Sequence, residues 1–319
     1  MTAKMISELP SDVMKLTHRA RTEDMFVAGW ASPSAGTYLV ELRLPYDHDF
    51  YPPTPLGDLD PLLLVESMRH SSILVSHAAL GVPLDHHFML QELEFRSPPV
   101  GPPPGPGPVR TVLEIRVGDV RSSAGRPCAM SYEWVLRHGS AVAATGRART
   151  RFCSPRVYRR LREGRAAVAH VTRAGPLLEP RRVGRAEERD VLLAPGPDDR
   201  AWLLRVNTEH RTLFQRPADH VPGMLLLEAA RQAATAATAP HRLAVTGGHI
   251  VFHRYAELDE PCVLTAAPDT RTDGRAAGTA ETAVHVVAAQ GGGTVFDCAF
   301  AGTVVRGDTA APARPAAVR

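Results

Sequence analysis

Two glutamates stand inside the most apolar stretches of the chain, each followed three residues later by an arginine. The pairs are Glu66 with Arg69 and Glu228 with Arg231. A carboxylate in an apolar helix is unfavourable unless it is paired, hydrogen-bonded or neutral. One interpretation is a buried carboxylate with a raised pKa, which suits a general base near neutral pH. The other is an ordinary ion pair on a helix, worth about a few tenths of a kcal/mol. The sequence leaves both interpretations open.

A carboxylate and a histidine, Asp219 and His220, directly precede the second apolar stretch. Unsatisfied backbone N–H groups at a helix start favour negative charge, so Gly223 and Met224 are candidates to polarise a carbonyl or hold an oxyanion. His220 is the candidate group for proton transfer. The alternative is a histidine that bonds loop backbone beside Asp219. The corresponding place before the first stretch holds Asp58, so the second stretch looks better equipped for catalysis.

The two apolar stretches are copies of one another. Residues 60–72 (DPLLLVESMRHSS) match residues 222–234 (PGMLLLEAARQAA) without a gap, and Glu66 and Glu228 lie 228 − 66 = 162 positions apart. An alternating strand precedes each predicted helix, and further alternating strands with glycine-containing turns follow it. We therefore expect two similar domains in tandem.

Both predicted helices are apolar nearly all round, so other elements must enclose each of them. Their starts are marked by Asp60 before Pro61 and by Pro222 before Gly223. A long helix wrapped by one curved antiparallel sheet is the hot-dog architecture, so the predicted fold is α+β, a double hot-dog. The predicted organisation is a first repeat at 1–153, an arginine-, proline- and glycine-rich linker at 154–182, a second repeat at 183–306 and a disordered tail at 307–319.

Composition argues against several classes of function. The 319 residues are 44% hydrophobic and 22% charged, which is typical of a folded globular chain. The apolar runs are too short to span a membrane and no signal segment is evident, so we expect a cytoplasmic protein. The net charge is only +3, and the arginine-rich segment 156–165 has Tyr158 as its one aromatic residue, so we expect no nucleic-acid partner.

Neither the cysteines nor the histidines have the spacing of a metal site. The four cysteines form no C-x-x-C pair, which indicates neither a zinc knuckle nor a disulfide framework. His249 and His253 form only a weak pair on one predicted strand. We therefore expect no metal. The sequence also lacks G-x-S-x-G and G-x-G-x-x-G, so nothing indicates a serine hydrolase or a dinucleotide-binding protein.

Residues 216–234 (RPADHVPGMLLLEAARQAA) resemble the most recognisable stretch of the A-factor biosynthesis family, and residues 60–72 resemble its counterpart in that family's first repeat. The resemblance extends in outline over nearly the whole chain, including V-G-R and D-V-L-L within 183–193. The family is similar in fold to β-hydroxyacyl carrier-protein dehydratases, whose helix carries E-A-x-x-Q, here Glu228 to Gln232. Many relatives have a histidine ahead of the proline where this chain has Arg216, so the role of that histidine would fall here to His220.

The resemblance implies an acyltransferase of signalling-molecule biosynthesis. Such an enzyme transfers a β-ketoacyl group from an acyl carrier protein thioester to dihydroxyacetone phosphate, and its product leads to a butenolide or furan phosphate, a precursor of γ-butyrolactone-type signals. It needs no cofactor of its own, because the substrate is carried on the phosphopantetheine of the carrier protein. It would be a monomer with intramolecular pairing of its repeats, or a dimer.

Roles for individual residues follow from combining the resemblance with the sequence pattern. Glu228 is the expected general base for the acceptor hydroxyl, with His220 and Asp219 completing the catalytic set. Arg231 is the expected phosphate ligand. The further candidates for substrate binding are Arg69, Glu66, Asn207 and Arg216, of which Asn207 is equally well explained as a turn residue.

Two alternatives stay open. A hot-dog dehydratase or thioesterase acting on acyl carrier protein thioesters needs no phosphate site, and Arg231 argues mildly against it. A noncatalytic module that binds acyl thioesters or lactones needs neither an acid nor a base. In that case neutral substitutions at Glu228 and His220 would leave ligand affinity intact.

Overall fold

The computed structural model describes residues 13–102, 105, 107–163, 165, 175–269 and 279–305. The tail expected at 307–319 lies outside the described residues, as do positions 164 and 166–174 of the expected linker. The domain limits given above therefore stay a prediction. No described helix is long and apolar enough to cross a membrane.

Both halves of the chain contain the same succession of strands around one long helix. The first half consists of α1 (Val13–Leu16), β1 (Val27–Ser34), β2 (Thr37–Leu44), α2 (Pro61–Ala78), β3 (His87–Arg96), β4 (Val109–Ser123), β5 (Arg126–His138) and β6 (Ala141–Cys153). A short helix, α3 (Pro155–Leu161), follows. The second half consists of β7 (Leu193–Pro195), β8 (Ala201–Leu204), α4 (Gly223–Thr238), β9 (Arg242–Phe252), β10 (Cys262–Asp269), β11 (Thr279–Gln290) and β12 (Gly293–Val305). Three single turns of 3₁₀ helix lie at Thr22–Asp24, Pro180–Val183 and Glu188–Asp190.

The two halves share one antiparallel sheet of twelve strands, in the order β1-β2-β4-β5-β6-β3-β9-β12-β11-β10-β8-β7. Read from either edge to the centre, each half has the same strand order. The halves meet where β3 pairs with β9, from Glu92 opposite Val251 to Arg96 opposite Gly247. The predicted double hot-dog is confirmed, and its two repeats pair within one chain.

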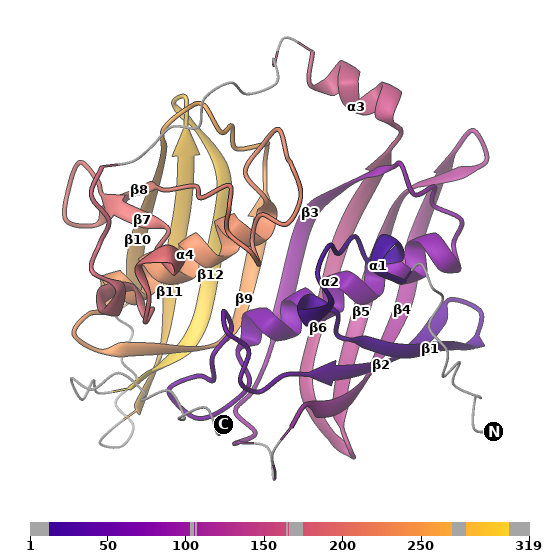
Figure 1. Ribbon diagram of the computed structural model, residues 1–319, viewed down its shortest axis with the longest axis horizontal. Helices are drawn as coiled ribbons and strands as arrows, with labels where there is room; N and C mark the ends of the chain where they lie inside the picture. The colour runs from indigo at the N-terminus through magenta and orange to yellow at the C-terminus, as the bar shows by residue number, and fades with distance from the viewer. Residues whose placement is uncertain are drawn as a thin grey trace.

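The helices α2 and α4 lie on the same face of the sheet and approach each other at the junction of the repeats (Figure 1), where Arg231 of α4 reaches Asp60 at the start of α2. Asp60 caps α2 as predicted, because its Oδ1 accepts a hydrogen bond of 2.8 Å from the Leu62 N–H. The N-cap of α4 is Pro222, which has no side chain to accept such a bond. The N-terminal N–H groups of α4 are therefore without a side-chain cap, which matters for the site described next.

Candidate active site

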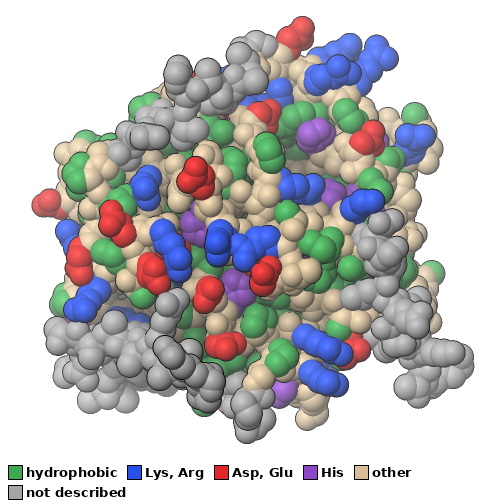
Figure 2. Space-filling model, in the orientation of Figure 1, with side chains coloured by type: hydrophobic (Ala, Val, Ile, Leu, Met, Phe, Trp, Pro, Cys, Tyr) green, Lys and Arg blue, Asp and Glu red, His purple; other side chains and the backbone are tan. Residues whose placement is uncertain are grey.

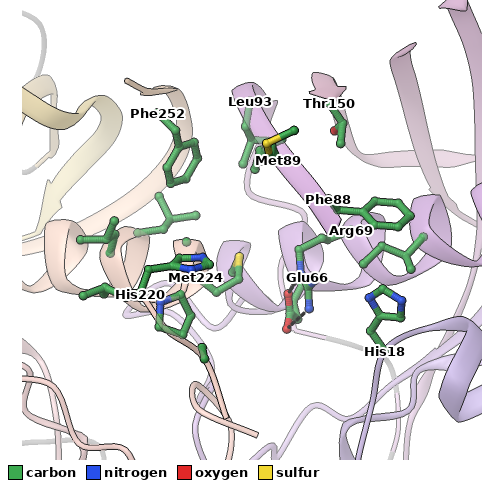
Figure 3. Close-up of a pocket in the computed structure, with 18 of the residues that line it drawn as sticks. His18, Glu66, Arg69, Phe88, Met89, Leu93, Thr150, His220, Met224 and Phe252 are labelled. Carbon is green, nitrogen blue, oxygen red and sulfur yellow. Dashed lines mark hydrogen bonds and ion pairs between the residues drawn. The ribbon is translucent and has the colours of Figure 1, made fainter. Parts of the chain in front are cut away.

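A cavity of about 540 Å³ lies between the two repeats and takes its lining from both of them. We call it the interrepeat cavity. Residues of α2 and β3 contribute from the first repeat, and the segment 212–227 contributes from the second. Figure 3 shows His220 at one side of this cavity and Glu66, Arg69 and His18 at the other, with Met224 between them. On the molecular face over the two central helices, charged side chains of both signs and histidines gather along the middle (Figure 2).

Glu66 and Arg69 lie at the first side of the cavity, together with Arg19. The Glu66 side chain is buried, and Arg69 donates to it from Nε at 2.6 Å and from Nη2 at 3.1 Å. Arg19 forms an ion pair with the same carboxylate and also contacts His70. Both oxygens of Glu66 are thereby engaged, so Glu66 holds the two arginines in place and is not free to act as a base.

Positive charge is in excess at this side. Arg216 also lines the cavity and meets no carboxylate among the described residues. Burial and the positive charge of Arg69 lower the pKa of Arg216. Burial, as the largest cause, lowers the pKa of Arg19 to about 9 and that of Arg69 to about 10. We call Arg19, Arg69 and Arg216 the arginine end; three guanidinium groups against one carboxylate favour an anionic ligand.

His220 and Asp219 form the other polar side, which we call the histidine end. His220 Nδ1 lies 2.8 Å from Asp219 Oδ1 and 3.2 Å from the hydroxyl of Tyr158. Burial, as the largest cause, lowers the pKa of His220, although Asp219 acts in the opposite direction. Burial raises the pKa of Asp219, but hydrogen bonds from Tyr158, His220 and Arg162 outweigh it, so that pKa lies well below its usual range. His220 is thus neutral at neutral pH beside an ionised carboxylate.

The hydrogen bond to Asp219 assigns the proton of the neutral imidazole to Nδ1. Nε2 then carries the lone pair and has no hydrogen-bond or ion-pair partner among the described residues. Because His220 lines the cavity, Nε2 is the nitrogen available to a substrate. An imidazole oriented by a carboxylate in this way is a competent general base.

The start of α4 lies at the cavity as well, since Gly223 and Met224 both line it. A Cβ atom at position 223 would lie 3.3 Å from the Phe252 ring, so a larger residue would crowd that ring. With no side-chain cap at Pro222, the first N–H groups of α4 are available to a developing oxyanion.

The rest of the cavity wall is largely apolar. Tyr132 and Trp134 of β5 hydrogen-bond back to α2, Tyr132 to Ser76 Oγ at 2.7 Å and Trp134 Nε1 to Ser72 Oγ at 2.9 Å. Gly146 on β6 permits this position of Trp134, because a Cβ atom there would lie 2.9 Å from the indole ring. Both rings are thus fixed in a wall suited to a hydrocarbon chain.

Glu228 and Arg231 occupy the equivalent positions in the second repeat, but neither lines the interrepeat cavity. Glu228 is fully buried, and it accepts hydrogen bonds from Arg185 Nε at 2.9 Å, from Arg231 Nε at 2.9 Å and from Gln232 Nε2 at 2.7 Å. Burial raises the pKa of Glu228, but Arg185 and Arg231 outweigh it and the net pKa is lowered. A carboxylate with both oxygens engaged and a lowered pKa does not suit a general base.

Arg231 uses its donors within the protein. It donates to Glu228 and, from Nη1, to Asp60 Oδ2 at 2.9 Å. Glu228 and Arg231 thus have their partners within the protein and lie outside the cavity, whereas His220, Arg69 and Arg216 line it. This geometry favours His220 as the base and Arg69 and Arg216 as phosphate ligands, and the roles expected for Glu228 and Arg231 stay predictions.

Asn207, Asp58 and His249 also lie apart from the cavity, whereas His253 lines it. Asn207 Oδ1 accepts from the Glu209 N–H at 3.0 Å, which is the turn role left open above. Asp58, the counterpart of His220, accepts from the N–H groups of Val100 and Gly101 at 2.6 Å each and so anchors a loop. His249 and His253 have separate carboxylate partners, Glu92 and Asp297. Within the described ranges, no group of three or more His, Cys, Asp or Glu side chains is placed to hold a metal.

Sequence reasoning missed Arg19, Arg185, Tyr158 and Arg162. A signal existed for the first two, because R-A-x-x-x-D occurs at 19–24 and again at 185–190. The two copies of this motif lie 185 − 19 = 166 positions apart, so a comparison without gaps at the offset of 162 does not align them. Tyr158 and Arg162 carry no comparable signal, because they lie in the arginine-rich segment read as a linker.

A family model described as the A-factor biosynthesis hotdog domain matches residues 4–154 and again residues 167–306. A 2-oxo-3-(phosphooxy)propyl 3-oxoalkanoate synthase of Streptomyces griseus is 40% identical over 263 residues, which cover 82% of this chain and 86% of the relative. A protein of the same name from Streptomyces coelicolor is 40% identical over 254 residues, or 79% of this chain and 81% of the relative. Among solved structures, the 12:0-ACP thioesterase from Umbellularia californica matches with a TM-score of 0.50 at 10% identity, over 84% of this chain and 98% of that one. This last likeness shows the fold alone.

Proposed function

The chain belongs to the A-factor biosynthesis hotdog-domain family, and we propose that it transfers a β-ketoacyl group from an acyl carrier protein thioester to the hydroxyl of dihydroxyacetone phosphate. The name of these relatives describes that ester. A 3-oxoalkanoate is a β-ketoacyl group, and 2-oxo-3-(phosphooxy)propyl is dihydroxyacetone phosphate linked through its hydroxyl oxygen. The observation that carries the proposal is that one cavity holds both the arginine end and the histidine end.

The arginine end binds the phosphate of the acceptor. A phosphate monoester carries a charge of about −1.5 to −2 near pH 7. Its oxygens match the planar arrangement of N–H donors in a guanidinium. Arg69 and Arg216 together have one carboxylate partner among the described residues, Glu66, so their positive charge is not balanced within the protein. Glu66 fixes Arg69 from behind, so the ligand meets an ordered donor group.

The histidine end activates the acceptor. Nε2 of His220 removes the proton from the hydroxyl, whose oxygen attacks the thioester carbonyl and forms a C–O bond. The N–H groups at the start of α4 stabilise the resulting oxyanion. When the intermediate collapses, the C–S bond breaks and the thiolate takes the proton from the imidazolium. Asp219 holds His220 in the required tautomer throughout.

The apolar wall near Tyr132 and Trp134 accommodates the alkyl chain of the acyl group. The transferred product carries an acidic methylene between two carbonyl groups and a ketone from the acceptor. Attack of that methylene carbon on the ketone, with loss of water, closes the ring of a butenolide phosphate, the precursor of a γ-butyrolactone-type signal.

We propose an acyl carrier protein as the donor partner and no resident cofactor, because the thioester brings its own activated carbonyl on phosphopantetheine. The reducing cytoplasm is the proposed compartment, and the four cysteines are all unpaired in keeping with it.

Mass spectrometry of the purified protein with a β-ketoacyl thioester and dihydroxyacetone phosphate tests the proposal. We expect the phosphorylated ester or its butenolide phosphate from the wild type and at least about a hundredfold less from His220→Asn. His249→Asn is the matched control, because that exposed histidine lies outside the cavity. Free β-keto acid as the only product would instead establish a thioesterase, and binding of the thioester without turnover would establish a binding module.

A further inference from the structure

The helix between the two repeats contacts the catalytic pair of the second. The Tyr158 hydroxyl of α3 donates to Asp219 Oδ1 at 2.6 Å. Arg162, which follows α3 directly, donates from Nε to Asp219 Oδ2 at 3.0 Å and from Nη2 to the Asp219 carbonyl oxygen at 2.9 Å. Three of the acceptor sites of one residue are thus taken by a segment 57 to 61 positions earlier in the chain.

Both donors are themselves held in place. The Tyr158 ring stacks on His87 of the first repeat, with the ring centroids 3.6 Å apart and the planes 3° from parallel. Arg162 binds Glu257 through Nη1 at 2.6 Å and Nη2 at 2.7 Å, and its guanidinium lies over the ring of Tyr255. Tyr158 and Arg162 are each only 8% exposed, so these contacts are shielded from solvent.

We propose that Tyr158 and Arg162 are positioning residues for the reaction, which hold Asp219 so that its Oδ1 fixes the Nδ1–H tautomer of His220 and leaves Nε2 to the substrate. The segment expected to be a plain linker is therefore part of the catalytic apparatus. The kinetic consequences of this inference rest on the proposed function. The contacts of Tyr158 and Arg162 with Asp219 do not depend on it.

The expected effect has a definite sign. Loss of the Tyr158 hydroxyl removes one donor from Asp219, so the carboxylate becomes more basic and holds a proton on His220 more firmly. Besides Tyr158 itself, the charged and titratable groups that face His220 are Asp219, Arg162, Glu257, His87 and Tyr255, and the substitution removes none of these five. The pKa of His220 therefore rises in Tyr158→Phe.

The first measurement is ¹H–¹⁵N NMR of the histidine rings across pH in the full chain without substrate. We expect one Nδ1–H tautomer for His220 in the wild type, and in Tyr158→Phe the same tautomer with a raised pKa, because the more basic Asp219 stabilises the imidazolium. Tyr46→Phe is the matched control. It removes a tyrosine hydrogen bond of 2.8 Å, to the Gly57 carbonyl oxygen, away from the cavity.

The second measurement is the pH dependence of kcat. Tyr158→Phe should lower kcat roughly tenfold or more, leave KM for dihydroxyacetone phosphate unchanged and move the acidic limb to higher pH. Arg162→Lys should move the limb in the same direction, because it loses the Nε donor to Asp219 Oδ2 while keeping the positive charge. A wild-type His220 in the Nε2–H tautomer, or an unchanged His220 pKa in both variants, would overturn the proposal. A shifted His220 pKa in a protein that makes no ester would overturn the proposed function and leave the positioning role standing.

Discussion

Arg231 on the second central helix pairs with Asp60 at the start of the first, with 2.9 Å between Nη1 and Oδ2. The same Asp60 caps its own helix, so one carboxylate serves both repeats. At the equivalent position, 60 + 162 = 222, the second repeat has Pro222. Within the part of the chain that the structure describes, Arg69 therefore meets no carboxylate from the opposite repeat, and this difference keeps the cavity at Arg69 positively charged.

Pro222→Asp should give Arg69 a carboxylate partner from the opposite repeat, as Asp60 already is for Arg231. A carboxylate at position 222 would compete with phosphate for Arg69, so we expect KM for dihydroxyacetone phosphate to rise at least about tenfold. Helix α4 should not suffer, because aspartate is a better N-cap than proline. Pro222→Asn, measured in the same steady-state assay, separates charge from shape. An equal rise in KM in both variants would mean that charge is not the cause.

Arg69→Gln should weaken binding of the acceptor, whereas Arg231→Gln should lower the stability of the fold. The first removes a ligand of the phosphate, so KM for the acceptor should rise about tenfold or more while the unfolding midpoint changes little. The second leaves Asp60 and Glu228 without their shared partner, so the free energy of unfolding should fall by about 3 kcal/mol. Kinetics and urea denaturation of both variants check this. A larger rise in KM for Arg231→Gln than for Arg69→Gln would return the phosphate site to the second repeat.

The pH profile of kcat should have an acidic limb with its midpoint below 6.5. Burial lowers the pKa of His220 from that value, so its basic form persists as the pH falls and activity is lost only at still lower pH. The measurement needs dihydroxyacetone phosphate at saturating concentration, because the phosphate of the substrate titrates at about pH 6, in the same pH range as His220. Below saturation, the two titrations would both affect the rate. A midpoint above 6.5 would show that Asp219 outweighs burial.

The free energy of unfolding should fall as the pH drops below 6.5. His70 and His77 are buried and His18 is half-buried, and burial is the largest cause that lowers each pKa, to about 3 for His18. Below 6.5 the unfolded chain binds protons that the folded chain does not, so each histidine costs up to about 1.4 kcal/mol per pH unit. Denaturation at several pH values should show a shallower slope in His18→Asn, since asparagine tolerates the φ of +59° at that position. An unchanged slope would rule out His18 as a contributor.

Ala148→Leu should shorten the preferred acyl chain. Ala148 lines the cavity and lies opposite Tyr132 in the sheet, so leucine fills space that the chain would otherwise occupy. We expect the preferred chain length to fall by roughly the three carbon atoms added, with KM for dihydroxyacetone phosphate unchanged. Competition between β-ketoacyl thioesters of different lengths, read by mass spectrometry, provides the test. An unaltered preference would place the acyl chain elsewhere.

The sequence by itself was sufficient for the fold. Alternating strands, two enclosed helices and the offset of 162 positions predicted two hot-dog repeats, because side-chain periodicity reports directly which face of an element is buried. It also determined the local partners. The contacts of Glu66 with Arg69 and of Glu228 with Arg231 join residues three apart, which one helical turn brings together in any context.

Only the tertiary structure decided that Glu66 and Arg69 line the cavity, whereas Glu228 and Arg231 lie outside it. The deciding contacts are Arg185 with Glu228 and Arg231 with Asp60, whose partners lie 43 and 171 positions apart. The contact of Tyr158 with Asp219 spans 61 positions in the same way. No periodicity encodes such contacts, because they depend on how the repeats meet at β3 and β9 and on where the chain between them returns to the second repeat.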